Sequence, residues 1–419
     1  MTPTRNWQQD ARHPCTTLPI PAEPGDAAVS ALHPPSVVGI VGGGQLGRML
    51  AHAAQRFGYR TAVLTGGAER TPAGTVADIE IAAAFDDAGA VQRFVDCADV
   101  ITWEFENVDL GVADAAADAG VPVRPGRQVV AATADRGAEK RAILGAGAPV
   151  APYREAASPR ELVAALDALD GPVICKTARN GYDGKGQIRI PNRRSLPEPP
   201  PVPERPPAPE PESIFKAMGS CRLVIEQEVT FDREVSVVVA RSTDGTVTDH
   251  GVMENVHVDG ILDTTVTPAR LPPAVAAEAR RLAARLAGHL DAVGVLCVEM
   301  FVVGTDLVVN EIAPRPHNSG HCTLEAAAAS QFEQQLRAVC GLPLGDGACR
   351  PAAMVQLLGH LWAGGAPPWE LALADPGVHL HLYGKHEARP GRKMGHLSCV
   401  DSTSERALER ALAARDRLA

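Results

Sequence analysis

The chain has 419 residues, a formal net charge of -10 and 45% hydrophobic residues. This length is enough for two or three domains with a full hydrophobic core. The acidic total argues against a protein that binds nucleic acid or a membrane surface through its overall charge, but it does not exclude a local basic pocket for a phosphorylated small molecule. No apolar run approaches the roughly 20 residues of a membrane span.

The nine cysteines include no CxxC pair and show no regular spacing. We therefore expect small core residues in a reducing cytoplasm, and neither a disulfide framework nor a zinc site. Residues 1–35 contain seven prolines and no apolar core of a secretory signal. They are expected to form a disordered extension in a cytoplasmic protein.

Strands and helices are expected to alternate from residue 36 onward. "SVVGIV" (36–41), "RTAVLT" (60–65) and "VITWEF" (100–105) are predicted strands, and "GGGQLGRMLAHAAQRFG" (42–58) opens a helix. This alternation predicts a doubly wound parallel sheet with helices on its faces, in an N-terminal α/β domain of residues 36–131.

A second domain is predicted over residues 132–341, and a small C-terminal domain over 351–418. The predicted elements of the second domain are a charged helix (134–149), the strands 171–177, 187–190, 223–229 and 234–241, a helix (274–290), the strands 295–303 and 306–313, and one helix (323–341). A lid is expected over about 172–240. It carries ten prolines among the 21 residues 191–211, a density that favours a solvated insertion.

The turn Gly42-x-Gly44-x-x-Gly47 follows a strand and opens a helix, which is the geometry of a phosphate cradle. A dinucleotide enzyme would carry an acidic residue at the end of the second strand, where this chain has Thr65. The turn therefore argues against NAD or FAD and favours the phosphate of another ligand. The alternative is a tight turn that binds nothing.

A glycine-rich loop, "KTARNGYDGKGQ" (176–187), joins two predicted strands. Its backbone can approach a polyphosphate closely, and Lys176 at the end of the first strand can reach a phosphate. The loop lacks the Gly-Lys-Ser/Thr of a Walker A motif. The alternative is a glycine-rich hairpin with a solvated lysine.

The strands 295–303 and 306–313 predict a hairpin with a pair of opposed carboxylates. A three-residue loop would pair Val303 with Leu307 and place Glu299 opposite Glu311. Two opposed carboxylates in apolar strands repel, and a bound Mg²⁺ would remove the repulsion. The alternative, two glutamates on a wet face, is weakened because 295–303 carries no other charge.

In this order, the lysine strand, glycine-rich loop, "VIEQEV" strand and two-glutamate hairpin resemble the ATP-grasp ligases. Within them the chain is most similar to the N5-carboxyaminoimidazole ribonucleotide synthetases, which act in purine biosynthesis. The resemblance covers about residues 37–401. It is carried by "GGGQLGRML", "ADR..EK", "GYDGKGQ", "EQEVTFDREVSV", "ENVHVDGIL", "NEIAPRPHNSGH" and "YGKHEARPGRKMGH".

The resemblance implies an ATP-grasp fold and a set of site residues. The implied ATP-binding residues are Arg136, Lys176, Gly181, Tyr182, Asp183, Gly184, Lys185, Gly186, Gln187, Glu226, Gln227, Glu228, Val229, Glu234, His257, Asn310 and Glu311. The implied Mg²⁺ ligands are Glu299 and Glu311, with Mn²⁺ as a substitute. The implied residues for aminoimidazole ribonucleotide are Gln45, Tyr182, Asp183, Lys385, Arg392 and Lys393.

The implied catalytic residues are Arg315 and His317, which would handle bicarbonate. The prolines on either side fix φ around Arg315, whose fork matches a small planar oxyanion. The alternative is a structural turn in which Arg315 pairs with a carboxylate. Asn310 is expected on the face of its strand opposite Glu311, and Gly320 is expected to turn the chain into the helix near Thr323.

The resemblance further implies a reaction, substrates and a homodimer. ATP would phosphorylate bicarbonate to carboxyphosphate, and the amine of the ribonucleotide would capture the carboxyl carbon. The chain departs from the family pattern at Lys185, where arginine is common, and by its insertion and N-terminal extension. Three alternatives stay open: an ATP-grasp ligase for a different amine, a nucleotide-binding regulatory protein without turnover, and a dinucleotide oxidoreductase.

Overall fold

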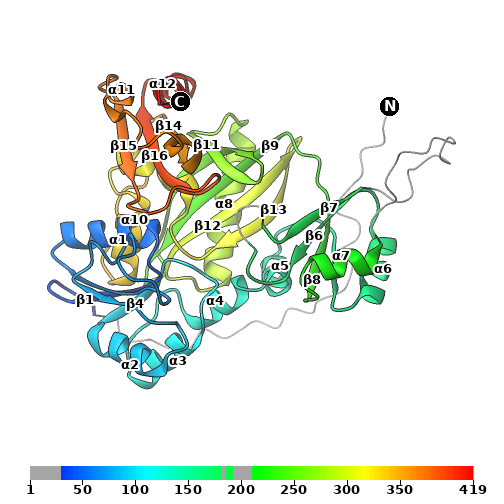
Figure 1. Cartoon of the computed structure of the whole chain (residues 1–419), viewed down its shortest axis with the longest axis horizontal. Helices are drawn as coiled ribbons and strands as arrows, with labels where there is room; N and C mark the ends of the chain where they lie inside the picture. Colours follow the sequence, from blue (N-terminus) through cyan, green and yellow to red (C-terminus); the bar gives the residue numbers. More distant parts are fainter. Residues whose placement is uncertain (1–29, 182–184, 192–209, 419) are drawn as a thin grey trace.

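The computed structural model describes residues 30–181, 185–191 and 210–418. It shows three layered units built around two four-stranded sheets and one eight-stranded sheet (Figure 1). The expected extension (1–35) and insertion (191–211) lie mostly outside the described residues. Pro211, the last residue of the predicted insertion, is the first residue of a helix, a position that tolerates proline.

The N-terminal domain is the predicted parallel α/β unit. Its sheet has the order β3-β2-β1-β4, and every pair is parallel. Apolar strands buried on both faces are typical of such a sheet. The elements are β1 (Val37–Val41), α1 (Gln45–Arg56), β2 (Arg60–Leu64), β3 (Ile79–Ile81), α2 (Ala88–Cys97), β4 (Val100–Trp103), α3 (Gly111–Asp118) and α4 (Arg127–Thr133).

The lid is an antiparallel sheet with the order β5-β8-β6-β7, and α5 connects it to the N-terminal domain. It spans residues 153–227, whereas the sequence predicted about 172–240, because β9 belongs to the large sheet instead. The elements are α5 (Arg136–Gly145), β5 (Tyr153–Ala156), α6 (Pro159–Ala168), β6 (Val173–Thr177), β7 (Gln187–Ile190), α7 (Pro211–Ala217) and β8 (Leu223–Gln227).

The large sheet has the order β13-β12-β9-β10-β11-β14-β16-β15 and continues into the C-terminal unit (Figure 1). Its elements are β9 (Arg233–Arg241), β10 (Val247–Val258), β11 (Ile261–Thr267), α8 (Pro273–His289), β12 (Gly294–Val303), β13 (Asp306–Ala313), η1 (Asn318–Gly320), α9 (Thr323–Ala326), α10 (Gln331–Val339), β14 (Ala352–Leu358), η2 (Gly359–Trp362), α11 (Trp369–Ala372), β15 (Val378–Leu382), β16 (Lys393–Val400) and α12 (Ser404–Asp416). The first C-terminal strand, β14, pairs with β11, so the C-terminal strands share a sheet with the central domain.

The single helix predicted over 323–341 is wrong, because the structure has two helices there, α9 and α10. Ser330 starts the second helix, and its side chain accepts a hydrogen bond from the Glu333 backbone N–H. An N-cap serine inside an alanine-rich run ends one helical segment and begins another.

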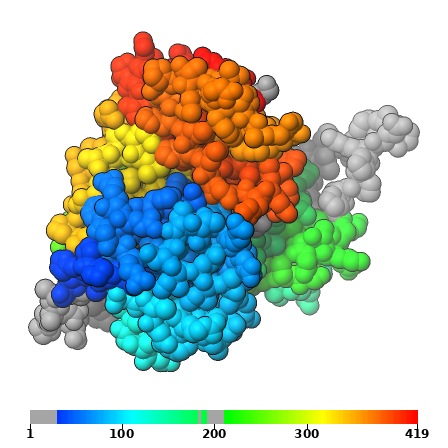
Figure 2. All heavy atoms as spheres, turned by 60° about the vertical axis from the view of Figure 1, so that its left-hand side comes forward, coloured from blue at the N-terminus to red at the C-terminus, as the bar shows by residue number. Residues whose placement is uncertain are grey.

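Two parts of the described chain that are far apart in sequence lie side by side. Figure 2 shows the N-terminal domain, in blue and cyan, lying directly against the C-terminal strands, in orange and red. The lid stands to one side of both. In the part of the chain that the structure describes, no helix is long and apolar enough to span a membrane, and all eight described cysteines are free thiols.

Candidate active site

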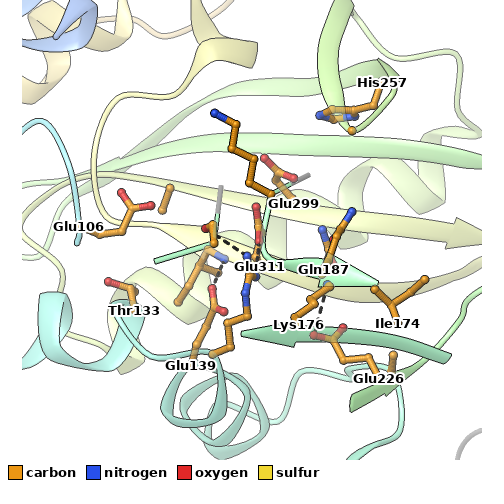
Figure 3. A pocket seen from close by; sticks show the side chains of 18 of the residues that line it. Glu106, Thr133, Glu139, Ile174, Lys176, Gln187, Glu226, His257, Glu299 and Glu311 are labelled. Carbon is orange, nitrogen blue, oxygen red and sulfur yellow. Dashed lines mark hydrogen bonds and ion pairs between the residues drawn. The ribbon is translucent and has the colours of Figure 1, made fainter. Parts of the chain in front are cut away.

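A pocket of about 400 Å³ opens between the lid, the large sheet and the end of β4 (Figure 3). The lining residues that the sequence analysis had singled out are Arg136, Lys176, Gly181, Lys185, Gln187, Glu226, Gln227, Glu228, Val229, Glu234, His257, Glu299, Asn310, Glu311, Arg315, His317 and Lys393. Tyr182, Asp183 and Gly184 lie outside the described residues. The structure thus brings together side chains from strands that are far apart in the sequence.

The lid side of the pocket is organised by Glu226, which is almost completely buried at the end of β8. Its carboxylate lies 3.2 Å from the Lys176 Nζ and 3.1 Å from the Lys140 Nζ. Burial opposes the charge on Glu226, but the two lysines lower its pKa to about 2. Lys176 is therefore directed into the pocket by an ionised partner and is not a solvated lysine.

The opposite wall carries two pairs of side chains: Glu234 and His257, which the resemblance implied, and Phe231 and Phe301, which the sequence analysis did not name. His257 Nδ1 lies 2.8 Å from Glu234 Oε2, and this carboxylate raises the histidine pKa against the effect of burial. Phe231 and Phe301 stack with ring centroids 4.6 Å apart, and both line the pocket. A flat apolar surface beside cationic and carboxylate groups suits a nucleotide base.

The β12–β13 hairpin places Glu299 opposite Glu311, as predicted, but through a different register. Val303 pairs with Asp306, so the turn has two residues (304–305) and not the three that the sequence analysis assumed. An extra residue further along β13 restores the pairing of the two glutamates. The predicted pair is correct because two errors of one residue cancel.

The extra residue is Asn310, which has no partner on β12 and forms a β-bulge beside Glu311. We expected Asn310 on the opposite face of the strand, and that expectation is wrong. The bulge interrupts the alternation of side chains, so that Asn310 and Glu311 both line the same pocket.

Each opposed carboxylate has a cationic neighbour. Glu311 Oε2 lies 2.8 Å from the Arg136 guanidinium, and Glu299 Oε1 lies 2.9 Å from His317 Nε2. Burial opposes the charge on Glu311, yet Arg136 and Lys176 lower its pKa to about 2. Within the described ranges no three His, Cys, Asp or Glu side chains are grouped closely enough to hold a metal ion by themselves.

Arg315 forms a two-point ion pair with Glu106 from the loop after β4. The Nε and Nη2 atoms lie 2.5 and 3.1 Å from the two carboxylate oxygens. Burial opposes the charge on Glu106, and Arg315 lowers its pKa. This is the carboxylate pairing that the alternative interpretation expected. Sequence reasoning missed Glu106, although a second acidic residue in "WEFEN" after a buried strand was a usable signal.

His317 ends a buried row of polar side chains that crosses the sheet. Its Nδ1 lies 2.9 Å from the Ser319 hydroxyl, which accepts a 2.8 Å hydrogen bond from Ser236. Asn255 donates to Ser236 at 2.9 Å and accepts from Thr265 at 2.9 Å. These polar residues sit inside otherwise apolar strands, so the row fixes the side of the pocket that holds His317 and Glu299.

The glycine turn before α1 does not hold a free phosphate cradle. The Gly44 backbone N–H donates to Glu104 Oε2 at 2.8 Å, and a Cβ at Gly42 or Gly44 would overlap this carboxylate. The prediction that the turn binds a ligand phosphate is therefore wrong. β4 lies beside β1, so Glu104, the first residue after β4, lies at the N-terminus of α1. Its carboxylate occupies the place of a ligand anion. Burial raises the pKa of Glu104.

The residues predicted for the second substrate lie beside the pocket rather than in one place. Lys393 lines it, Lys385 donates to the Lys393 carbonyl at 2.7 Å, and Gln45 donates to Asn318 at 3.4 Å. Arg392 donates to the Glu387 carbonyl at 2.9 Å, within its own loop. Of these four residues only Lys393 lines the pocket. Lys385 and Gln45 contact the lining residues Lys393 and Asn318, and Arg392 lies outside the lining.

Comparisons with known proteins agree with this arrangement. Three family models match in chain order: a ribonucleotide synthetase preATP-grasp domain (residues 36–133), an ATP-grasp domain (141–332) and a phosphoribosylaminoimidazole carboxylase C-terminal domain (352–410). The N5-carboxyaminoimidazole ribonucleotide synthase of Bacillus subtilis is 40% identical over 374 residues, which are 88% of this chain and 92% of that protein.

The chain belongs to the N5-carboxyaminoimidazole ribonucleotide synthase family. Its fold is the ATP-grasp fold with a preATP-grasp domain and a family-specific C-terminal domain. A crystal structure of a family member with ADP has a TM-score of 0.83 and 38% identity, and the match covers 92% of this chain and 98% of that one. The crystal structure of the Aspergillus clavatus synthase with ADP and 5-aminoimidazole ribonucleotide has a TM-score of 0.78 and 30% identity. This match covers 91% of this chain and 98% of that one.

Membership of this family excludes the dinucleotide oxidoreductase that the glycine turn had left open. The N5-carboxyaminoimidazole ribonucleotide synthases are ATP-grasp ligases, so this chain is an ATP-grasp ligase as well. The hairpin, the lid lysine and the aromatic pair all face it.

Proposed function

We propose that this chain carboxylates 5-aminoimidazole ribonucleotide with bicarbonate, at the expense of ATP, to give N5-carboxyaminoimidazole ribonucleotide, ADP and phosphate. The observation that carries the proposal is the convergence of Lys176, the opposed pair Glu299 and Glu311, and Arg315 on one pocket. These are the groups that phosphoryl transfer to a small oxyanion needs: a phosphate-binding cation, metal-binding carboxylates and a guanidinium cation, which Glu106 holds in place.

The hairpin carboxylates fit a divalent cation. Glu299 and Glu311 face each other across β12 and β13 and line the pocket, and two carboxylates with phosphate oxygens are a usual Mg²⁺ site. Bound Mg²⁺ would neutralise charge on the transferred phosphate. Arg136 and His317, which now pair with these carboxylates, would then be available to the phosphates and to bicarbonate.

The residues of the chain would divide the work by position. Lys176 and Arg136 would hold the phosphates, and Glu234 and His257 would face the ribose. The stacked rings of Phe231 and Phe301 would face the base. An oxygen of bicarbonate would attack the γ-phosphorus as its bond to ADP breaks, giving carboxyphosphate. The ribonucleotide amine would then take the carboxyl carbon, lose a proton and release phosphate. Positioning and charge supply most of such catalysis.

Release of ADP under four conditions tests this proposal: with or without bicarbonate, and with or without the ribonucleotide. We expect rapid ADP release only when both are present, and strong loss in Arg315→Lys and His317→Asn with unchanged nucleotide affinity. ADP release with a different amine, but not with this ribonucleotide, would favour the related ligase. Nucleotide binding without any turnover would favour the regulatory protein.

Three further expectations accompany the function. Lys385 and Gln45 would contact the ribonucleotide, and Arg392 and Lys393 would lie near its phosphate. Lys385 donates to the Lys393 carbonyl and Gln45 donates to Asn318, so both are tied to residues that line the pocket. The chain would form a homodimer, which light scattering would test. It would act in the cytoplasm, in keeping with the free thiols of the eight described cysteines.

A further inference from the structure

Glu311 lies on an irregular part of the sheet, at its edge. β13 is an edge strand, and the bulge at Asn310 removes one residue from the ladder with β12. An edge strand leaves backbone groups without strand partners, and a bulge weakens the constraint on the side chains beside it. Something other than the sheet must therefore fix the backbone on both sides of Glu311.

The first turns of α5 supply that constraint. Glu139 Oε1 accepts a 2.7 Å hydrogen bond from the Ile312 backbone N–H, and the Lys140 Nζ donates to the Asn310 carbonyl at 2.7 Å. These are the backbone groups directly after and directly before Glu311. Figure 3 shows Glu139 beside Glu311 at the floor of the pocket. Both α5 side chains are almost fully buried, so water does not compete for them.

The same face of α5 also reaches the carboxylate itself. Arg136, one turn earlier on the helix, lies 2.8 Å from Glu311 Oε2. Lys140 additionally pairs with Glu226 on the lid, 3.1 Å away. One turn of α5 therefore contacts three consecutive residues of β13, 310–312. The same turn is linked to the lid by the buried ion pair of Lys140 and Glu226.

We propose that Glu139 and Lys140 are positioning residues that clamp the β13 bulge and so set the direction of the Glu311 carboxylate. In this role they act through the backbone of residues 310–312, although Glu139 also lines the pocket. The effect on the enzyme rests on the proposed function, but the clamp itself can be observed in the metal-free chain. Groups that orient metal ligands are worth about 10- to 100-fold in metal affinity or activity.

Two measurements on a set of matched variants test the clamp. The first is hydrogen exchange of the Ile312 amide in the metal-free chain, and the second is the Mg²⁺ concentration that gives half-maximal ADP formation. Glu139→Leu removes the acceptor, and Glu139→Gln keeps an acceptor oxygen at the same distance. Gln335→Leu is the control, because Gln335 accepts from the Val295 N–H, another buried strand amide of β12, away from the pocket.

We expect Glu139→Leu to speed exchange at Ile312 roughly tenfold or more and to raise the Mg²⁺ requirement roughly tenfold. Glu139→Gln should stay within a few-fold of the original chain in both, and Lys140→Met should resemble Glu139→Leu in the Mg²⁺ requirement. Gln335→Leu should lower stability and leave the Mg²⁺ requirement unchanged. Should Glu139→Leu fail to fold, Glu139→Asp, which withdraws the acceptor by one methylene, takes its place with the same expectation.

Three results would overturn the proposal. They are unchanged Ile312 exchange in Glu139→Leu, an equal Mg²⁺ shift in Gln335→Leu, and a Glu139→Gln variant as impaired as Glu139→Leu, which would show that charge and not the hydrogen bond matters. Loss of the proposed function would instead appear as absent turnover in the unsubstituted chain with normal Ile312 protection.

Discussion

Single charged side chains in this pocket are held by partners that lie far away in the sequence. Arg315 at the end of β13 pairs with Glu106 after β4, and Arg136 on α5 pairs with Glu311 on β13. Such pairs fix the orientation of the arginine guanidinium before any anionic ligand binds. Local sequence could identify the arginines as candidates. It could not indicate which carboxylate pairs with which arginine, because the two partners lie far apart in the sequence.

The Arg315–Glu106 pair gives a prediction at this scale. Glu106→Gln leaves the guanidinium without its charged partner in a largely buried place, where the two side chains are only 14% and 19% exposed. We expect a loss of about 3 kcal/mol in the free energy of unfolding, measured in urea. The control is Asp114→Asn, which breaks an exposed pair with Arg127 and should cost less than about 1 kcal/mol. Equal losses in the two variants would show that Glu106 does not hold Arg315.

Most of the predicted strands formed where the sequence pattern indicated them, whereas the helix over 323–341 and the irregular parts of the hairpin did not. The strands and helices around "VVGIV", "VICKT" and "REVSVVVAR" formed where hydrophobic periodicity indicated them. The hairpin that carries both glutamates was predicted with the correct pair but the wrong turn and no bulge. A bulge depends on what packs against the strand, here α5, and no local pattern encodes that contact.

The hairpin also corrects an expectation about stability. Opposed carboxylates alone would repel, so that removing one would stabilise the metal-free chain. Because Arg136 and His317 compensate them, we expect Glu311→Gln to lower the free energy of unfolding by about 1–3 kcal/mol. Turnover should fall roughly 100-fold or more. A variant that is more stable than the original chain, or that keeps near-normal ADP formation at ordinary Mg²⁺, would contradict this.

The whole molecule is more continuous than its sequence domains indicate. The C-terminal strands were expected as a separate small unit, yet β14 pairs with β11 and extends the sheet that carries the hairpin. Val266 on β11 packs with Ala353 and Ala407 in one buried cluster. Pairing between strands some 90 residues apart in sequence is set by packing, which composition and periodicity do not report.

Removal of the C-terminal unit tests this continuity. A chain that ends at residue 350 exposes the β11 edge and the apolar face that α12 covers, so it should aggregate or unfold well below the melting temperature of the full chain. The measurement is thermal unfolding by circular dichroism together with the aggregation state. A truncated chain that unfolds cooperatively at the same temperature would show that the central domain is independent.

The central claim is that bicarbonate is phosphorylated in this pocket before its carbon reaches the ribonucleotide. The most direct measurement uses bicarbonate labelled with ¹⁸O in all positions, with ATP and the ribonucleotide, and mass spectrometry of the phosphate. Attack by a bicarbonate oxygen on the γ-phosphorus leaves that oxygen on phosphorus when the carboxyl group is transferred. We predict one ¹⁸O in each phosphate released with product. Unlabelled phosphate, formed at the same rate as product, would contradict the account.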